Sequence, residues 1–133
     1  MNSCDIIIIG SGPGGYELAA NAVKHNLSTV IIERDQLGGT CLNRGCIPTK
    51  ALCRSAEVAD LVRNASSFGV EVNEFSLSYS KAVNRKDEIV EQLRQGVSML
   101  LNGATVVKGE AKFTGENVVE VNGESYTAPV SYT

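Results

Sequence analysis

The chain has 133 residues and a formal net charge of −3, which fits one domain. This charge argues against a broad nucleic-acid surface, because such a surface needs a basic excess. No apolar run approaches the ~20 residues of a membrane span, and the N-terminus has no positive charge for a signal peptide. We therefore predict a cytoplasmic protein, whose four cysteines are more typical of catalysis or metal binding than of a structural disulfide framework.

The first 33 residues predict a nucleotide-binding βαβ unit. Residues 5–9 form a β-branched run, typical of a strand buried on both faces. A glycine-rich turn follows at residues 10–15, and then a helix is expected from residue 16 to about 25. Residues 28–32 predict a second strand, which Glu33 follows. In dinucleotide-binding units an acid lies roughly 20 residues past the glycines.

Several residues of this unit have a physical role. Gly10 allows a tight turn, Gly12 lets the backbone approach a pyrophosphate, and Gly15 lets the helix lie close to the sheet. Pro13 suits the first helical turn, where free N–H groups face phosphates. Glu33 is expected to accept hydrogen bonds from both ribose hydroxyls and to repel the 2′-phosphate of NADP. The alternatives are a tight turn without a ligand and an exposed strand-end carboxylate.

Two cysteines follow in a glycine-rich stretch. Residues 35–45 predict a loop that contains Cys41, and a helix is expected to begin near Pro48 because proline disfavours helix at the preceding residue. This helix is expected to end by Ser66. Cys46 then lies at or just before a helix N-terminus, which favours a thiolate. We predict a redox-active disulfide between the two cysteines; a pair of inert thiols or a zinc site remains an alternative.

The remaining residues predict packing elements. A short edge strand or loop is expected at residues 68–72, and a long amphipathic packing helix at residues 79–101 with Asn102-Gly103 as its C-cap. The single histidine, His25, is expected at the end of the first helix rather than as a base. Cys4, at the start of a strand, and Cys53, within a helix, are interpreted as structural. Short strands are expected at residues 105–108, 111–113, 117–121 and 124–127, with a hairpin turn at Asn122-Gly123.

The glycine turn, Glu33 and residues 39–50 (GTCLNRGCIPTK) resemble the flavin-dependent disulfide reductases, and among them most closely the dihydrolipoyl dehydrogenases. The resemblance implies an α/β fold: a Rossmann-like FAD-binding domain with a parallel sheet, long helices and a β-meander. It implies that Cys41 exchanges with dihydrolipoamide, that Cys46 forms the charge-transfer thiolate beside the flavin, and that Lys50 approaches flavin N5. The implied cofactor-binding residues are Gly10, Gly12, Pro13, Gly14, Gly15, Glu33, Arg34, Gly39, Thr40, Lys50 and Ala111.

The resemblance covers nearly the whole chain but only the first part of a longer enzyme. Residues 1–133 are therefore expected to be the N-terminal portion of the FAD-binding domain, incomplete at its C-terminus, since residues 128–133 do not predict the strand and Ala-Thr-Gly turn that close this domain in the family. The NAD-binding and dimerisation domains are expected to lie elsewhere, together with the catalytic histidine, which the family supplies from the partner subunit.

The resemblance also implies an activity and partners for the full-length enzyme. It is expected to be a homodimer that oxidises protein-bound dihydrolipoamide with NAD, with no nucleic-acid or membrane partner. Its protein partners would be lipoyl-bearing acyltransferases or carrier proteins of 2-oxo acid dehydrogenase or glycine cleavage complexes. The chain alone is expected to be inactive. The alternatives are another flavin disulfide reductase, of the mercuric or glutathione reductase type, and a non-catalytic truncated flavin-binding fragment.

Overall fold

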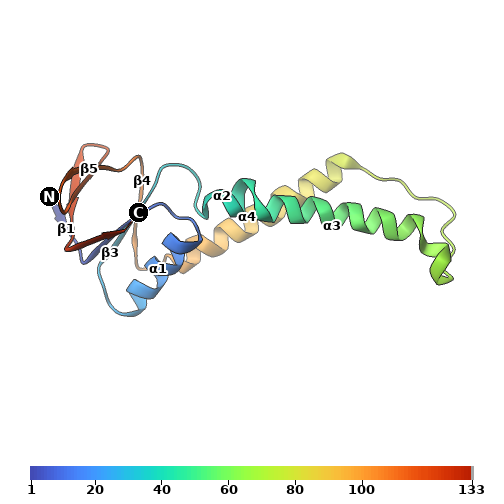
Figure 1. Cartoon of the computed structure of the whole chain (residues 1–133), viewed down its shortest axis with the longest axis horizontal. Coiled ribbons are helices and arrows are strands. Elements are labelled where there is room, and N and C mark those ends of the chain that lie inside the picture. Colours follow the sequence, from blue (N-terminus) through green and yellow to red (C-terminus); the bar gives the residue numbers. More distant parts are fainter. Residues whose placement is uncertain (133) are drawn as a thin grey trace.

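The structure, a computed structural model, describes residues 1–132. Two sheets lie at one end of the molecule, and a long pair of helices extends away from them (Figure 1). In chain order the elements are β1 (Asn2–Ser3), β2 (Ile6–Ile9), α1 (Pro13–Lys24), β3 (Thr29–Glu33), α2 (Gly39–Arg44), α3 (Cys46–Arg63), the 3-10 helix η1 (Ala65–Phe68), α4 (Tyr79–Leu100), β4 (Thr105–Lys108), β5 (Lys112–Gly115), β6 (Val118–Val121), β7 (Glu124–Thr127) and β8 (Val130–Tyr132).

A parallel sheet in the order β4-β3-β2-β8 lies between two hydrophobic cores. Successive side chains of a strand point to opposite faces. Ile6 and Ile8 therefore pack with buried residues of α1, α2 and α4, whereas Ile7 packs with buried residues of β6 and β7. Burial on both faces explains the unbroken isoleucine run of β2. The predicted α/β class and the first βαβ unit are confirmed.

A second sheet has the order β1-β7-β6-β5, and β5, β6 and β7 form an antiparallel meander. The β6–β7 hairpin closes at Asn122 and Gly123, whose φ angles are +52° and +80°. Two positive φ angles are what a two-residue type I′ turn requires. The expected hairpin and meander are therefore confirmed, and this sheet covers one face of the parallel sheet.

Helices α3 and α4 lie side by side and form a long arm (Figure 1). Two residues of α4, Val90 and Val97, are buried, and so is Leu101, which directly follows the helix. The part of the arm next to the sheets therefore belongs to the core on one face of the parallel sheet. At the far end Phe68 and Leu77 are 75% and 58% exposed. The predicted long amphipathic helix is confirmed. Within residues 1–132, no helix is long and apolar enough to cross a membrane.

The structure corrects the expected boundaries around the cysteines. Residues 39–44 form the short helix α2 instead of a loop, so Cys41 is helical. Helix α3 begins at Cys46, two residues before the expected start at Pro48. Proline is tolerated there because N–H groups of the first turn have no intrahelical partner.

Other expectations fail elsewhere in the chain. Residues 130–132 form β8, which pairs in parallel with β2, although residues 128–133 were not expected to give a strand. In this pairing Ile6 lies opposite Val130 and Ile8 lies opposite Tyr132. Residues 68–72 contain the end of η1 and irregular chain instead of an edge strand, and Cys4 lies between β1 and β2 rather than at the start of a strand. Thr133, the last residue of the expected domain, lies outside the described residues.

Candidate nucleotide and dithiol site

The glycine turn connects the end of β2 directly to α1. Gly10 has φ +94°, and its N–H donates to the Ile32 carbonyl at 2.7 Å. A Cβ added to Gly15 would lie 2.0 Å from the Gly10 carbonyl oxygen, so only glycine allows α1 to start this close to the turn. Added Cβ atoms at Gly12 and Gly14 would meet no atom within 4 Å. Open space therefore lies beside the first turn of α1, whose N–H groups have no intrahelical partner, and this arrangement fits a phosphate group.

Glu33, the last residue of β3, is already held by protein donors. Its Oε2 accepts from the Ser11 N–H at 2.8 Å and the Ser11 hydroxyl at 2.7 Å, and its Oε1 accepts from the Asp35 N–H at 2.8 Å. Burial opposes ionisation, but these hydrogen bonds outweigh it and lower the pKa of the Glu33 carboxyl. A carboxylate has about four acceptor positions. About one is therefore left in this arrangement, fewer than two ribose hydroxyls would need.

Two neighbouring pockets run from the glycine turn along the ends of β3 and β4. Both are lined by Gly10, Glu33 and Arg34. The first, of about 340 Å³, also includes Gly12, Asp35, Gln36, Gly39, Thr40, Asn43 and Arg44. The second, of about 200 Å³, also includes Ile9, Ile32, Gly109, Glu110 and Ala111. The structure thus brings seven of the expected cofactor-binding residues into one continuous region, and a pocket of about 380 Å³ beside it is lined by Pro13, Gly14 and Gly15.

The start of the cysteine stretch contacts the glycine turn directly. Gly39 has φ +69°, and a Cβ added there would lie 2.6 Å from the Gly12 Cα. The Gly38 N–H donates to the Ser11 carbonyl at 3.0 Å. Ser11, which is fully buried, therefore joins Glu33 to the segment that leads into α2. The cysteines and the expected nucleotide platform are parts of one site.

Cys41 and Cys46 lie close together and are free thiols in the structure. Cys46 is the first residue of α3, as expected. A Cβ added to Gly45 would lie 3.2 Å from the Thr40 carbonyl oxygen and 3.3 Å from the Cys41 Cα, so the two helices approach each other tightly at this residue. A hydrogen bond with the Cys46 side chain raises the pKa of the Cys41 thiol. Their disulfide stays a prediction.

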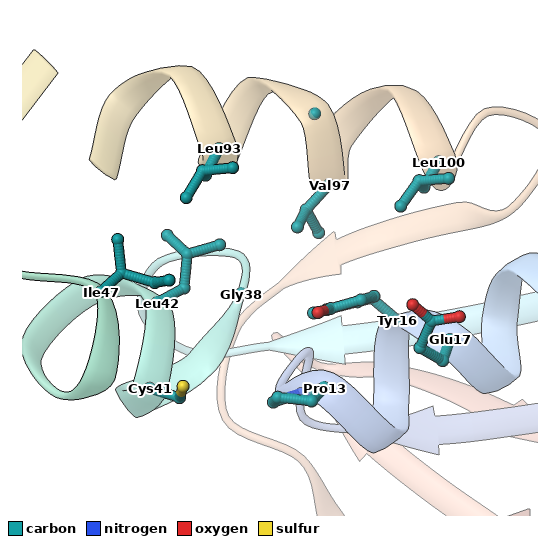
Figure 2. A pocket seen from close by; sticks show the side chains of 11 residues that line it. Pro13, Tyr16, Glu17, Gly38, Cys41, Leu42, Ile47, Leu93, Val97 and Leu100 are labelled. Atoms are coloured by element: carbon teal, nitrogen blue, oxygen red, sulfur yellow. The ribbon is translucent and has the colours of Figure 1, made fainter. Parts of the chain in front are cut away.

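Cys41 lines an apolar pocket of about 460 Å³ between α1, α2, the start of α3 and α4. Figure 2 shows the α4 side chains pointing across this pocket toward those of α1 and α2. Its lining consists of Pro13, Tyr16, Glu17, Gly38, Cys41, Leu42, Ile47, Leu93, Gly96, Val97 and Leu100. Sequence reasoning missed this pocket and assigned Leu93 and Leu100 to packing alone. Their exposures of 41% and 49% show that the packing they were expected to make is incomplete.

The remaining candidates lie around this site. Lys50 lies one helical turn after Cys46 and thus on the same face of α3, and its charge slightly opposes the rise in the pKa of Cys41. His25 is exposed at the C-terminus of α1, as expected from the sequence. Cys53 lies within α3, as expected, but its side chain is exposed, which the structural role expected for it did not predict. Among the described residues, no group of three or more metal-ligating side chains could hold an ion.

A model of the pyridine nucleotide-disulphide oxidoreductase family matches residues 4–129. The chain belongs to this family. It is 48% identical over 122 residues to a dihydrolipoyl dehydrogenase of Chlorobaculum parvum, covering 90% of this chain and 26% of that relative. It is 44% identical over 124 residues to a dihydrolipoyl dehydrogenase of Bacillus subtilis, covering 90% of this chain and 27% of the relative. The family predicted from the motifs is confirmed.

A solved structure supports the same assignment. The HOCl-induced flavoprotein disulfide reductase RclA from Escherichia coli, solved as a Cu(II) complex, matches with a TM-score of 0.76 and 27% identity. The match covers 98% of this chain and 28% of the RclA chain. The chain thus spans about a quarter of the length of these proteins, and its fold is that of a flavoprotein disulfide reductase over this part.

Proposed function

We propose that residues 1–133 form the N-terminal portion of the FAD-binding domain of a dihydrolipoyl dehydrogenase. In this proposal the protein moves two electrons from dihydrolipoamide through the Cys41–Cys46 pair to FAD, and then to NAD bound by another part of the protein. The observation that carries the proposal is the position of Cys41, which lines an apolar pocket while its helix contacts the glycine turn through Gly39.

The residues fit FAD at the glycine turn. Open space lies beside Gly12 and Gly14, and the first-turn N–H groups of α1 would bind the pyrophosphate there. Glu33 would bind a ribose hydroxyl, and the pocket at Ala111 would hold the adenine. When bound, FAD would accept two electrons from the reduced cysteine pair and pass them to NAD. Arg34, Thr40 and Lys50 would contribute the remaining contacts of this chain.

The cysteines would perform thiol–disulfide exchange. A thiolate of the substrate attacks the sulfur of Cys41, the Cys41–Cys46 bond breaks, and its electron pair leaves on Cys46. The second substrate thiol then displaces Cys41, so the substrate gains a disulfide and the protein a dithiol. We assign the leaving role to Cys46 because it is the first residue of α3, where the N–H groups of the first turn have no intrahelical partner.

The pocket suits a lipoyl group because its walls are mainly aliphatic, with Leu42 and Val97 among them. The proton of the attacking thiol needs a base. His25 lies at the exposed end of α1, so we assign the base to a histidine of the partner subunit in a homodimer. The protein partners would be lipoyl-bearing acyltransferases or carrier proteins of 2-oxo acid dehydrogenase or glycine cleavage complexes.

The exchange step is tested by oxidising the purified protein, reducing it with dihydrolipoamide and locating alkylated thiols by mass spectrometry. We expect a Cys41–Cys46 disulfide that dihydrolipoamide reduces. Cys41→Ser and Cys46→Ser should abolish it, and Cys53→Ser, on the exposed surface of α3, should leave it unchanged. A disulfide that involves Cys53, or none at all, would contradict the proposal.

FAD binding is tested by titration with detection of flavin fluorescence. Glu33→Ala should weaken binding by about 1.5–3 kcal/mol for each hydrogen bond lost to the ribose. Glu116→Ala is the control, because it removes an exposed carboxylate that lines none of the three pockets at the glycine turn. Equal affinities of the wild type and Glu33→Ala would show that Glu33 does not bind the ribose.

A further inference from the structure

Asn43 lies between Cys41 and Cys46 in the sequence. Every donor and acceptor position of its side chain has a partner. Its Nδ2 donates to the carbonyls of Leu37 and Gly39, both at 2.9 Å. Its Oδ1 accepts from Nε and Nη2 of Arg94 at 3.1 and 2.9 Å. An amide side chain has two donor hydrogens and two acceptor lone pairs. Asn43 therefore connects the start of α2 to a residue of α4 that is 51 positions away along the chain.

Arg94 is itself held in place on α4. It forms an ion pair with Glu91, one turn earlier, which also accepts a hydrogen bond from Gln95. Its side chain is 27% exposed, so solvent only partly competes for its donors. The planar guanidinium presents two N–H groups to one acceptor in a fixed arrangement. The contact between α4 and Asn43 is therefore directional, unlike the aliphatic packing around it.

Helix α2 needs an anchor of this kind. It has six residues, and an isolated helix of that length is unstable in water. Helix α4 has 22 residues and a buried face, so it is the more rigid of the two. Arg94 does not line the pocket at Cys41, which leaves its two contacts with Asn43 as its connection to the cysteine stretch.

We propose that Arg94 is a positioning residue for the Cys41–Cys46 pair, because its bidentate contact with Asn43 fixes α2 against α4 and thereby sets the separation of the two sulfurs. This inference rests on the proposed redox role of the pair. Disulfide formation within one chain depends on the effective concentration of one thiol at the other. A free α2 samples more positions, so loss of Arg94 makes the disulfide less favourable relative to the dithiol.

The test measures the equilibrium between dithiol and disulfide in the purified protein. Samples are equilibrated with glutathione redox buffers, quenched with acid and alkylated, and the Cys41–Cys46 disulfide is quantified by mass spectrometry. For Arg94→Leu we expect the equilibrium constant for oxidation to fall about tenfold. Arg94→Lys should recover part of this loss, because an ammonium group can still donate to the Asn43 oxygen.

Arg85→Leu is the matched control. Arg85 also lies on α4, but it donates to the Ala51 carbonyl of α3 at 3.3 Å and not to α2. Its loss removes an arginine contact within the arm and should change the oxidation constant less than twofold. Unfolding midpoints of both variants separate a general loss of stability from a specific effect on the thiols. An equal shift in both variants would overturn the proposal.

A double-mutant cycle tests whether Arg94 affects the cysteine pair through its hydrogen bonds with Asn43. If Arg94 acts through Asn43, Arg94→Leu combined with Asn43→Ala should shift the oxidation constant no further than the larger single effect. Additive shifts, or no shift in Arg94→Leu, would refute the positioning role. If Arg94→Leu fails to fold, Arg94→Met, whose thioether has no donor hydrogen, gives the same comparison. A wild-type protein that forms no Cys41–Cys46 disulfide in any buffer would instead refute the proposed function.

Discussion

Single residues connect the glycine turn to the cysteine stretch. Ser11 is fully buried, and its N–H and hydroxyl both donate to Glu33. Gly39 lies against the Gly12 Cα at a distance that leaves no room for a side chain. These contacts explain why a substitution at one end of the site should affect the other. Two predictions test them.

The first prediction concerns the stability of the fold against acid. The pKa of Glu33 is lower in the folded chain than its ordinary value, since Ser11 and Asp35 stabilise the carboxylate against the opposing effect of burial. Its contribution is therefore fully present above the unfolded-state pKa of about 4.3 and is lost as the pH falls through the lower folded-state value. Glu33→Gln should remove this contribution.

The measurement is the free energy of denaturant unfolding from about pH 6 to about pH 3. The difference between wild type and Glu33→Gln should shrink as the pH falls. Ser11→Ala, which removes one of the three donors, should give an intermediate dependence. A difference that stays constant over this range would show that Glu33 is not ionised through these contacts.

The second prediction compares two glycines with similar φ angles. Gly39→Ala should destabilise the fold by roughly 2–5 kcal/mol, which combines left-handed strain with a backbone clash at Gly12. Gly69 has φ +74°, but an added Cβ there would meet no atom within 4 Å. Gly69→Ala should therefore cost only the strain, roughly 1–2 kcal/mol. Equal losses in thermal or denaturant unfolding would mean that Gly39 does not contact the glycine turn.

At the scale of elements, α2 is stabilised by its neighbours. Leu42 is its buried residue and belongs to the core that includes α1 and α4. A Cβ at Gly38 would lie 2.6 Å from a Leu42 methyl group, so the Leu42 side chain packs against the residue that precedes α2. Helix α2 is therefore held by one apolar contact region and by the Asn43–Arg94 hydrogen bonds.

The third prediction follows from the burial of Leu42, which is 7% exposed. Leu42→Ala should lower the free energy of unfolding by roughly 2–5 kcal/mol and should increase the alkylation rate of Cys41, because α2 loses its apolar anchor. Leu61→Ala on α3 is the control: Leu61 is 54% exposed, and its truncation should change stability by at most about 0.5 kcal/mol. Leu42→Ala with the stability and alkylation rate of the wild type would contradict this account of α2.

At the scale of the whole molecule, stability is concentrated at the sheets. The parallel sheet has a core on each face, whereas the far end of the arm is a pair of helices with exposed apolar side chains (Figure 1). The expected site lies between these regions, at the ends of the strands and the base of the arm. We therefore expect the far end of the arm to be less stable than the sheet that positions the nucleotide groups.

The fourth prediction is a gradient of amide hydrogen exchange. Amides of β2 and β3, where Ile7 and Ile31 are fully buried, should exchange only on global unfolding. Amides of residues 61–77 should exchange roughly a hundredfold faster or more, because few buried contacts protect them. Mass spectrometry of peptic peptides measures both regions together. Equal protection of the arm tip and the sheet would show that the chain unfolds as one cooperative unit.

The sequence by itself determined the parts of the fold that depend on local patterns. The isoleucine run, the glycine turn and the acid after β3 define the first βαβ unit, and Asn122-Gly123 defines a hairpin, because each signal lies within a few residues. The spacing of the apolar residues at 79–101 was also sufficient to predict helix α4. The same motifs identified the family and placed both cysteines at one site.

Only the tertiary structure decided the features that depend on distant contacts. Helix α2 has only six residues and lies between Gly38 and Gly45, so it gives no local signal. It is stabilised by the burial of Leu42 and by the hydrogen bonds between Asn43 and Arg94. Strand β8 pairs in parallel with β2, which is 124 residues earlier in the case of Ile6 and Val130. The pocket at Cys41 combines residues of α1, α2, α3 and α4. Such arrangements depend on how the elements pack, which no local pattern encodes.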